Sequence, residues 1–222
     1  ASQSQSQVYD ILSKEEEDTA REFIALGAGI VVVAAPGTNG SHRLTGNASA
    51  AAYIVCPAAP TSYERRALKA APETERRRHV TCHWLEMSVY NGFAIPLTGG
   101  DGKGGGNPAY RPLPCDAPCE SMIGLKISTS LYDESVKSSV YMLCHLLGSK
   151  YTDRLGRNKN THLVVPVADG AKYKAAKEWG LHVVTVQWLH ACVAAGKRVD
   201  QRDFAPPPPQ PEAPRRRLRS PT

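Results

Sequence analysis

The sequence has no long hydrophobic segment and few large aromatic residues. Its uninterrupted apolar runs, such as the six residues 30–35, are no longer than seven residues, whereas a helix needs roughly 20 apolar residues to cross a bilayer. The first seven residues, ASQSQSQ, also lack the basic and apolar regions of a secretion signal. The sequence therefore predicts neither a membrane-spanning segment nor a signal peptide, and we expect no membrane partner.

Motifs for catalysis or for a cofactor are also missing. The segment GGDGKGGGN at residues 99–107 imitates a phosphate-binding loop but lacks a Lys-Ser or Lys-Thr pair before a helix. Cys115 with Cys119, and Cys82 with His83, are candidate zinc ligands, yet neither has a clear second spaced pair. We therefore predict a protein that is not an enzyme, with no cofactor, no metal and no small-molecule substrate.

The cysteines indicate a compartment rather than a set of crosslinks. Six cysteines in a secreted protein of this length could pair, but a chain of 222 residues can bury a core without disulfides. In the absence of a secretion signal, we expect free thiols and a reducing, intracellular environment.

The net charge of the chain does not identify a ligand. The net charge is +6, and half of it comes from the last 18 residues, 205–222, where four arginines oppose Glu212. The remaining excess is small, and an excess of this size commonly serves only solubility.

Composition divides the chain into five segments. Gly, Ser and Pro build no core, because Gly and Ser resist ordering and Pro stiffens into an extended helix. We therefore predict a disordered start (1–7), a Gly/Pro-rich linker (98–120) and a Pro/Arg-rich disordered tail (205–222). Between them lie two domains, residues 8–97 and residues 121–204.

These two domains carry the same pattern. The motif V-T-x-x-W-L-x-x-x-V-x-x-G begins at Val80 and again at Val184, a constant offset of 104 residues. Such self-similarity is the mark of a repeated structural unit. The first copy is longer, and we place its extra residues in a Gly/Ser/Asn-rich loop after Pro36 and in a helical segment after Pro60, where insertions are tolerated.

The second copy alternates short strands with helices. This alternation predicts an α/β fold in which a small parallel sheet is flanked by helices, one such unit per copy. The first copy follows the same plan, and its first helix begins at a capping box made by Ser13 and Glu16. The expected elements of the second copy are strands at 124–128, 150–152, 162–167 and 183–186, and helices at 133–147, 172–179 and 186–195.

Four residues are assigned to the structural core. Trp84 and Trp188 each lie at a strand-to-helix junction inside an apolar motif, where a tryptophan anchors packing. Gly148 is the expected stop of the helix at 133–147, and Thr161 opens the strand motif THLVV. We interpret His162, inside that motif, as a structural histidine.

The second copy resembles the BRCT repeat, the breast-cancer C-terminal module of DNA-damage and replication proteins. The resemblance covers about 70 residues and rests on LGSKY from Leu147, THLVV from Thr161, KYKAAKEWG from Lys172 and VTVQWLHAC from Val184. The segment YRPLP…GLKISTSLYD, residues 110–133, is most similar to the fourth and fifth repeats of the topoisomerase-II-binding-protein family and its plant meiotic relatives. In the first copy the resemblance rests on ALGAG at 25–29 and HVTCHWL at 79–85, and this copy is divergent.

This resemblance implies a fold and a ligand. BRCT repeats are four-stranded parallel sheets with helices on both faces, and tandem pairs usually pack together. Many of them bind phosphoserine or phosphothreonine through a hydroxyl at the end of the first strand, the next backbone N–H and a lysine that opens the second helix. Lys172 lies 16 residues before Trp188, which is the family's spacing, and it is the implied phosphate-binding lysine.

The hydroxyl partner is less sharply defined. The distance from Gly148 selects Ser130, strand alternation favours Ser128, and Thr129 lies between them; we rank Ser130 first and Thr129 second. Leu131 follows Ser130 where family members commonly have glycine. Lys137 lies near a basic position of the family's first helix, where it supports the phosphate-binding loop or is simply solvated.

The first copy departs from this pattern. Asp10, in the expected first strand at 8–12, would repel a phosphate, and the helix at 62–69 has no lysine that aligns with Lys172. We predict that the first copy is structural.

The resemblance therefore implies a nuclear, non-catalytic scaffold module that binds phosphorylated protein partners through its second repeat. The pathway would be the DNA damage response, replication initiation or meiotic recombination. The alternative functions are DNA binding and purely structural protein–protein interaction. DNA would be bound by basic clusters: residues 76–78, the tail arginines, and Lys150, Arg154, Arg157 and Lys159.

Overall fold

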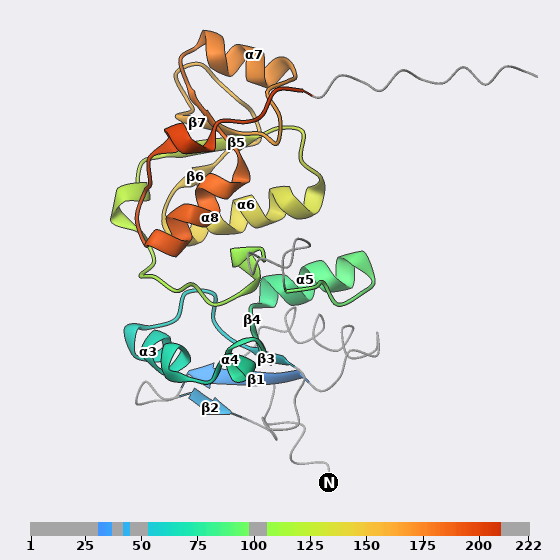
Figure 1. Cartoon of the computed structure of the whole chain (residues 1–222), viewed down its shortest axis with the longest axis vertical. Coiled ribbons are helices and arrows are strands. Elements are labelled where there is room, and N and C mark those ends of the chain that lie inside the picture. The colour runs from blue at the N-terminus through green and yellow to red at the C-terminus, as the bar shows by residue number, and fades with distance from the viewer. Residues whose placement is uncertain (1–30, 37–41, 45–52, 98–105, 210–222) are drawn as a thin grey trace, which may run out of the picture.

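The computed structural model describes residues 31–36, 42–44, 53–97 and 106–209. Within them the chain forms two units stacked along the long axis of the molecule, each built on a four-stranded sheet (Figure 1). The predicted capping box at Ser13 and Glu16, the strand at 8–12 with Asp10, the motif at 25–29 and the arginines of the tail lie outside the described residues.

The second repeat has the predicted order of strands and helices. Its sheet has the order β6-β5-β7-β8, and all neighbouring strands are parallel. Its elements are β5 (Lys126–Thr129), α6 (Glu134–Leu147), β6 (Lys150–Tyr151), β7 (His162–Val164), α7 (Ala171–Glu178), β8 (His182–Val184), α8 (Val186–Ala195) and the short helix η3 (Gln201–Phe204).

Local sequence explains where helix α6 begins and ends. The Asp133 carboxylate accepts a hydrogen bond from the Val136 N–H at 2.9 Å, which caps the amino end. Gly148 follows the helix with φ +83°, a left-handed conformation that favours glycine. A Cβ at Gly148 would lie 2.9 Å from the Cβ of Pro118, so close packing as well as the turn requires glycine there.

Helices cover both faces of this sheet. Helices α6 and α8 pack on one face, where the buried Ile127, Val164 and Val184 meet Leu143 and Trp188. Helix α7 covers the opposite face over a smaller cluster of Leu163, Val165 and Ala176. The carboxyl end of β5 and the amino end of α7 are thereby held next to each other, which positions the site described below.

The first repeat has a mixed sheet. Its elements are β1 (Val31–Pro36), β2 (His42–Leu44), β3 (Tyr53–Val55), α3 (Ser62–Ala70), α4 (Glu73–Arg76), β4 (His79–Val80) and α5 (Cys82–Asn91). Strands β1, β3 and β4 are parallel, but β2 pairs antiparallel with β1, which the expectation of a wholly parallel sheet did not include. Strand β2 arises from the insertion after Pro36, and strands joined by so short a connection pair antiparallel.

The carboxyl-terminal halves of the two repeats share hydrogen bonds as well as sequence. The Trp84 Nε1–H donates to the carbonyl of Ile95 at 2.9 Å, and the Trp188 Nε1–H donates to the carbonyl of Val199 at 3.1 Å. Both tryptophans are completely buried, and in each case the acceptor lies 11 residues further along the chain. Each indole thus fixes the chain that follows the last helix of its repeat.

The repeats and the segment between them share one hydrophobic core. That core runs from Val80 and Leu85 in the first repeat, through Leu113 between the repeats, to Val140 and Leu189 in the second. Polar contacts join α5 and α6 across the boundary: the buried His83 Nε2 lies 3.3 Å from the Ser139 hydroxyl, which also accepts a hydrogen bond from the Asn107 amide at 2.6 Å. The two repeats therefore pack together.

Two segments that the sequence assigns to linker and tail make specific contacts. The predicted linker holds two short helices, η1 (Pro108–Tyr110) and η2 (Glu120–Met122). The tail was predicted to be disordered from residue 205, but the carbonyl of Pro207 accepts a hydrogen bond from the Ala168 N–H at 2.8 Å. The main chain of proline-rich residues offers acceptors to a neighbouring loop, and the start of the predicted tail makes such a contact at Pro207.

All six cysteines lie in the described ranges and are free thiols. Among the helices that the structure describes, none is long and apolar enough to span a membrane.

Candidate phosphate-binding site

Lys172 is directed to the end of the central strand of the second sheet. It is the second residue of α7, and its ammonium donates to the carbonyl of Thr129 at 2.9 Å and to the carbonyl of Asp153 at 2.7 Å. An ammonium has three N–H donors. The two carbonyls therefore hold the amine in place without neutralising it, and one donor is left for a ligand.

The three candidate hydroxyl residues differ in access. Ser128 is completely buried, and its hydroxyl has no partner within the described residues. Thr129 is 3% exposed, and its hydroxyl lies 2.9 Å from that of Tyr151. Ser130 is only partly buried, and its hydroxyl makes no hydrogen bond in the part of the chain described. The hydroxyl that is both accessible and unengaged is that of Ser130.

Backbone donors distinguish Ser130 from Thr129 in the same way. The Ser130 N–H, which would serve if Thr129 were the hydroxyl residue, already donates to the carbonyl of Val164 at 3.1 Å. The N–H of Leu131, which would serve with Ser130, has no hydrogen bond among the residues that the structure describes. The geometry thus pairs the Ser130 hydroxyl with the N–H of Leu131.

The amino end of α7 lies against the turn that follows β5. Leu131 has φ +64°, which turns the chain sharply after Ser130. Gly170, the residue before α7, has φ +89°, and a Cβ there would lie 3.6 Å from Cδ1 of Leu131. No side chain caps α7 in the described structure, and its first turn holds no acidic residue. Its first N–H groups and their partial positive charge are therefore available to an anion.

Lys137 adds a second positive charge. It lies on the first turn of α6, 3.4 Å from a carboxylate oxygen of Glu134. Burial lowers the pKa of Lys172; the carboxylate of Asp153 raises it, and the charge of Lys137 lowers it further. The two amines are thus close enough to repel each other, and the carboxylates of Asp153 and Glu134 offset part of that repulsion.

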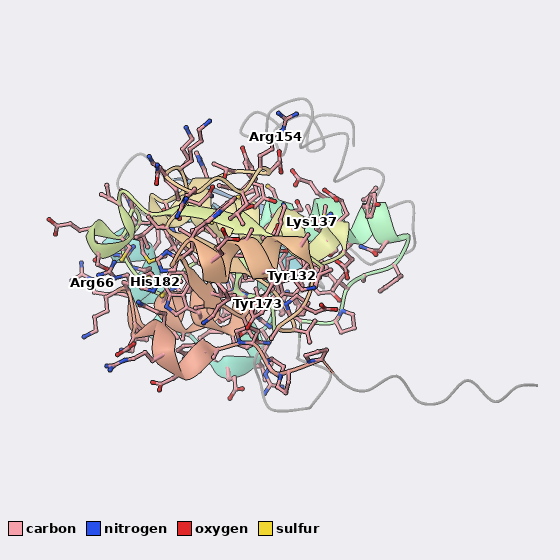
Figure 2. All side chains as sticks on the ribbon, turned by 90° about the horizontal axis from the view of Figure 1, so that it is seen from above. Arg66, Tyr132, Lys137, Arg154, Tyr173 and His182 are labelled. Carbon is pink, nitrogen blue, oxygen red and sulfur yellow. The ribbon has the colours of Figure 1, made fainter. Side chains whose placement is uncertain are left out.

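Figure 2 looks onto the second repeat and labels Lys137, which belongs to α6, Tyr132, from the loop before α6, and Tyr173, which belongs to α7. The Tyr132 hydroxyl accepts a hydrogen bond from the N–H of Val186 at 3.1 Å, which fixes the loop after β5 to the start of α8. The site is therefore anchored to both layers of helices.

Sequence reasoning missed two contributors. Tyr151 orients Thr129 through the hydroxyl contact, and burial raises its pKa. Asp153 contributes its backbone carbonyl, and a backbone contact leaves no pattern in the sequence of side chains. Tyr151 belongs to the LGSKY motif, so its position in the sequence was visible but its contact was not.

The corresponding helix of the first repeat, α3, is closed by its own side chains. The Thr61 hydroxyl accepts from the N–H of Glu64 at 3.3 Å, and the Glu64 carboxylate accepts from the N–H of Thr61 at 2.6 Å. This capping box neutralises the helix end with a buried carboxylate. An anion is therefore disfavoured at α3 for a reason that the sequence analysis did not consider.

The remaining predicted residues have structural contacts. Thr161 is half-buried, and its hydroxyl accepts from the N–H of Lys126 at 2.9 Å and donates to the carbonyl of the same residue at 3.1 Å. His162 stacks on Trp188 with ring centroids 4.7 Å apart. Across residues 31–36, 42–44, 53–97 and 106–209, no group of three or more metal-binding side chains is present.

Comparison with known proteins agrees with this architecture. Residues 125–188 match the family model of the twin BRCT domain. The crystal structure of BRCT repeats 3 and 4 of S. pombe Rad4 superposes with a TM-score of 0.61 at 17% sequence identity, covering 89% of this chain and 94% of that one. The chain folds as a tandem BRCT pair. A structure of yeast Rtt107 and Mms22 gives a TM-score of 0.50 at 21% identity, over 70% of this chain and 33% of that one.

Curated relatives of this tandem BRCT pair include PAX-interacting protein 1. The mouse protein is 30% identical over 144 residues, which are 62% of this chain and 12% of the relative. The zebrafish protein is 29% identical over 144 residues, or 62% of this chain and 13% of the relative. The chain thus spans about an eighth of the length of these relatives.

Proposed function

We propose that this tandem BRCT pair is a non-catalytic scaffold module that binds phosphoserine- or phosphothreonine-containing segments of partner proteins through its second repeat. The proposed site consists of Ser130, the N–H of Leu131, the amino end of α7 and Lys172, with Lys137 at its border. Thr129 acts through its backbone carbonyl and is the second choice for the hydroxyl.

The observation that carries this proposal is the position of the Lys172 amine. It is held by two backbone carbonyls at the end of β5, 2.9 Å from Thr129 and 2.7 Å from Asp153, with no carboxylate as its hydrogen-bond partner. A phosphate monoester carries a charge of about −1.5 to −2 and three acceptor oxygens. It matches an amine, a free hydroxyl and the open end of a helix.

The cellular role follows from the BRCT resemblance. We propose a nuclear location and a role in the DNA damage response, in replication initiation or in meiotic recombination. The narrower kinship with the fourth and fifth repeats of the topoisomerase-II-binding-protein family, and the domain limits at 8–97 and 121–204, are part of the same proposal.

The direct test is capture of peptides from a degenerate phosphoserine and phosphothreonine library, with the unphosphorylated library run beside it. We expect capture only of phosphorylated peptides. Loss of a charge-assisted hydrogen bond costs about 1.5 to 3 kcal/mol, so Lys172→Ala should weaken binding of a captured peptide at least about tenfold. Lys174→Ala, which removes an exposed lysine of the same helix, should leave the affinity unchanged.

Equal affinity of the Lys172→Ala and wild-type proteins would reject the site. Phosphate-independent binding would reject the proposed function. DNA binding predicts a third result, in which a short DNA duplex binds with a steep salt dependence that Lys172→Ala does not alter.

A further inference from the structure

A groove of about 840 Å³ lies between α3, the segment after η1 and the end of α8, and no residue of the Lys172 site lines it. Arg66, which lines it, and Lys137 appear at opposite sides of the molecule in Figure 2. The groove is therefore separate from the proposed phosphate-binding site, and nothing in the proposed function uses it.

The walls of this linker groove are strongly cationic. One acidic residue, Asp116, is present among the described residues that line it, and it pairs with Arg65. The cationic residues of the lining are Arg65, Arg66, Lys69, Arg76 and Arg111. The groove thus has a surplus of positive charge.

Backbone carbonyls, rather than carboxylates, position Arg76 and Arg111. Arg76 donates to the carbonyl of Lys69 at 2.9 Å, and Arg111 donates to the carbonyl of Arg76 at 3.1 Å. A carbonyl orients a guanidinium but leaves its net charge. Burial, followed by the charge of Arg77, lowers the pKa of Arg111, so the protein holds these cations together at an energetic cost. Such an arrangement is complementary to an anion.

The floor of the groove is apolar. Leu68, Pro112, Leu113 and Pro114 line it together with Ala194 of α8. Leu113 lies beneath this surface and supports it, because it is 1% exposed and its N–H donates to the carbonyl of Ala58 at 2.9 Å, whereas Leu68, Pro112, Pro114 and Ala194 are accessible. A nucleic-acid backbone needs hydrated cations but no apolar floor. A peptide presents carboxylates and apolar side chains together, and so it fits both surfaces.

We propose that the linker groove binds an acidic segment of a partner protein, in which aspartates and glutamates flank an apolar side chain. The carboxylates contact the arginine walls, and the apolar side chain packs on the proline and leucine floor. The tandem pair then has two anion-binding surfaces of different chemistry: one for a phosphate monoester in the second repeat and one for carboxylates between the repeats.

The test uses a fluorescent peptide of alternating acidic pairs and leucines, with a second peptide in which Asn and Gln replace Asp and Glu. We expect binding of the acidic peptide alone. The double variant Arg66→Glu and Lys69→Glu changes two exposed side chains of the groove and should weaken binding about tenfold or more. The matched double reversal of Arg157 and Lys159 to Glu, at exposed positions outside the lining, should have no such effect.

Two further measurements separate this proposal from the proposed function. Lys172→Ala should leave binding of the acidic peptide unchanged; loss of binding in that variant would overturn the linker groove as its site. Single-stranded DNA is the competing ligand. If it bound more tightly than the peptide, and if the double variant Arg66→Glu and Lys69→Glu lost this binding, the assignment of the groove to a peptide would be overturned. Equal affinity of the groove variant and the wild-type protein would also overturn it.

Discussion

The two repeats share one anchoring arrangement but differ at the first turn of the helix that follows the third strand of each sheet. In both, a buried tryptophan donates to a carbonyl 11 residues further along. In the second repeat, helix α7 opens without a side-chain cap and presents Lys172. In the first, Thr61 and Glu64 close the opening of α3. The anchoring tryptophan is thus common to both repeats, and under the proposed function the first turn of one helix separates the repeat that binds an anion from the one that does not.

The first prediction concerns the shared anchor and has the largest expected effect. Trp84→Ala and Trp188→Ala should each lower the free energy of unfolding by about 3 to 5 kcal/mol, because each removes a completely buried aromatic side chain. Thermal unfolding of the two variants measures this. If only one variant lost stability, the equivalence of the two anchors would be contradicted.

The second prediction uses the aromatic partner of each tryptophan. His162 stacks on Trp188, whereas Tyr53 contacts Trp84 with ring centroids 4.4 Å apart. Burial, followed by the charges of His182 and Arg198, lowers the pKa of His162 from 6.5 to about 4. Acid should therefore destabilise the protein through the aromatic partner of Trp188 in the second repeat, and not through the aromatic partner of Trp84 in the first.

The sign of this effect is fixed by proton uptake. Between pH 6.5 and about 4 the unfolded histidine binds a proton and the folded one does not, so stability falls as the pH falls through this window. The loss reaches about 3 kcal/mol for His162. Urea unfolding should show that His162→Phe loses less stability between pH 7 and pH 4 than the wild-type protein, whereas His145→Gln, at an exposed position, does not differ from it. Identical losses in His162→Phe and wild-type protein would contradict this account.

The third prediction compares two glycines that end helices in the same left-handed conformation, Gly148 after α6 and Gly92 after α5. Gly148→Ala should cost about 2 to 3 kcal/mol, because it combines a left-handed φ with a clash against Pro118 at 2.9 Å. Gly92 has φ +74° but open space around it, so Gly92→Ala should cost only about 1 kcal/mol. Chemical denaturation measures both, and equal costs would show that packing against Pro118 contributes nothing.

Sequence reasoning reached the parts of the fold that local chemistry determines. The offset of 104 residues between Val80 and Val184 located the matching halves, and glycine stops marked the ends of α6 and α8. The antiparallel β2 was not predicted, because composition shows a loop but not how its residues pair. The contact of Pro207 with Ala168 was missed because it depends on main-chain groups brought together only by folding.

The residues of the candidate site were likewise predicted only in part. Spacing from Trp188 selected Lys172, and the structure brings its amine to the end of β5. Spacing from Gly148 selected Ser130, whereas strand alternation favoured Ser128 with Thr129 between them. Sequence could not resolve this conflict, since the choice depends on which hydroxyl and which N–H are already engaged. The contact of Lys172 with the Asp153 carbonyl could not be predicted, because every residue has a backbone carbonyl and the sequence does not mark which one is used.

The most direct test of the contrast between the repeats is a titration of ¹⁵N-labelled protein with one captured phosphopeptide, followed by amide chemical shifts. The account predicts the largest shifts at Ser130, Leu131 and the first turn of α7, none at the first turn of α3, and their loss in the Lys172→Ala protein. Large shifts at Thr61 and Glu64, with β5 and α7 unchanged, would contradict it.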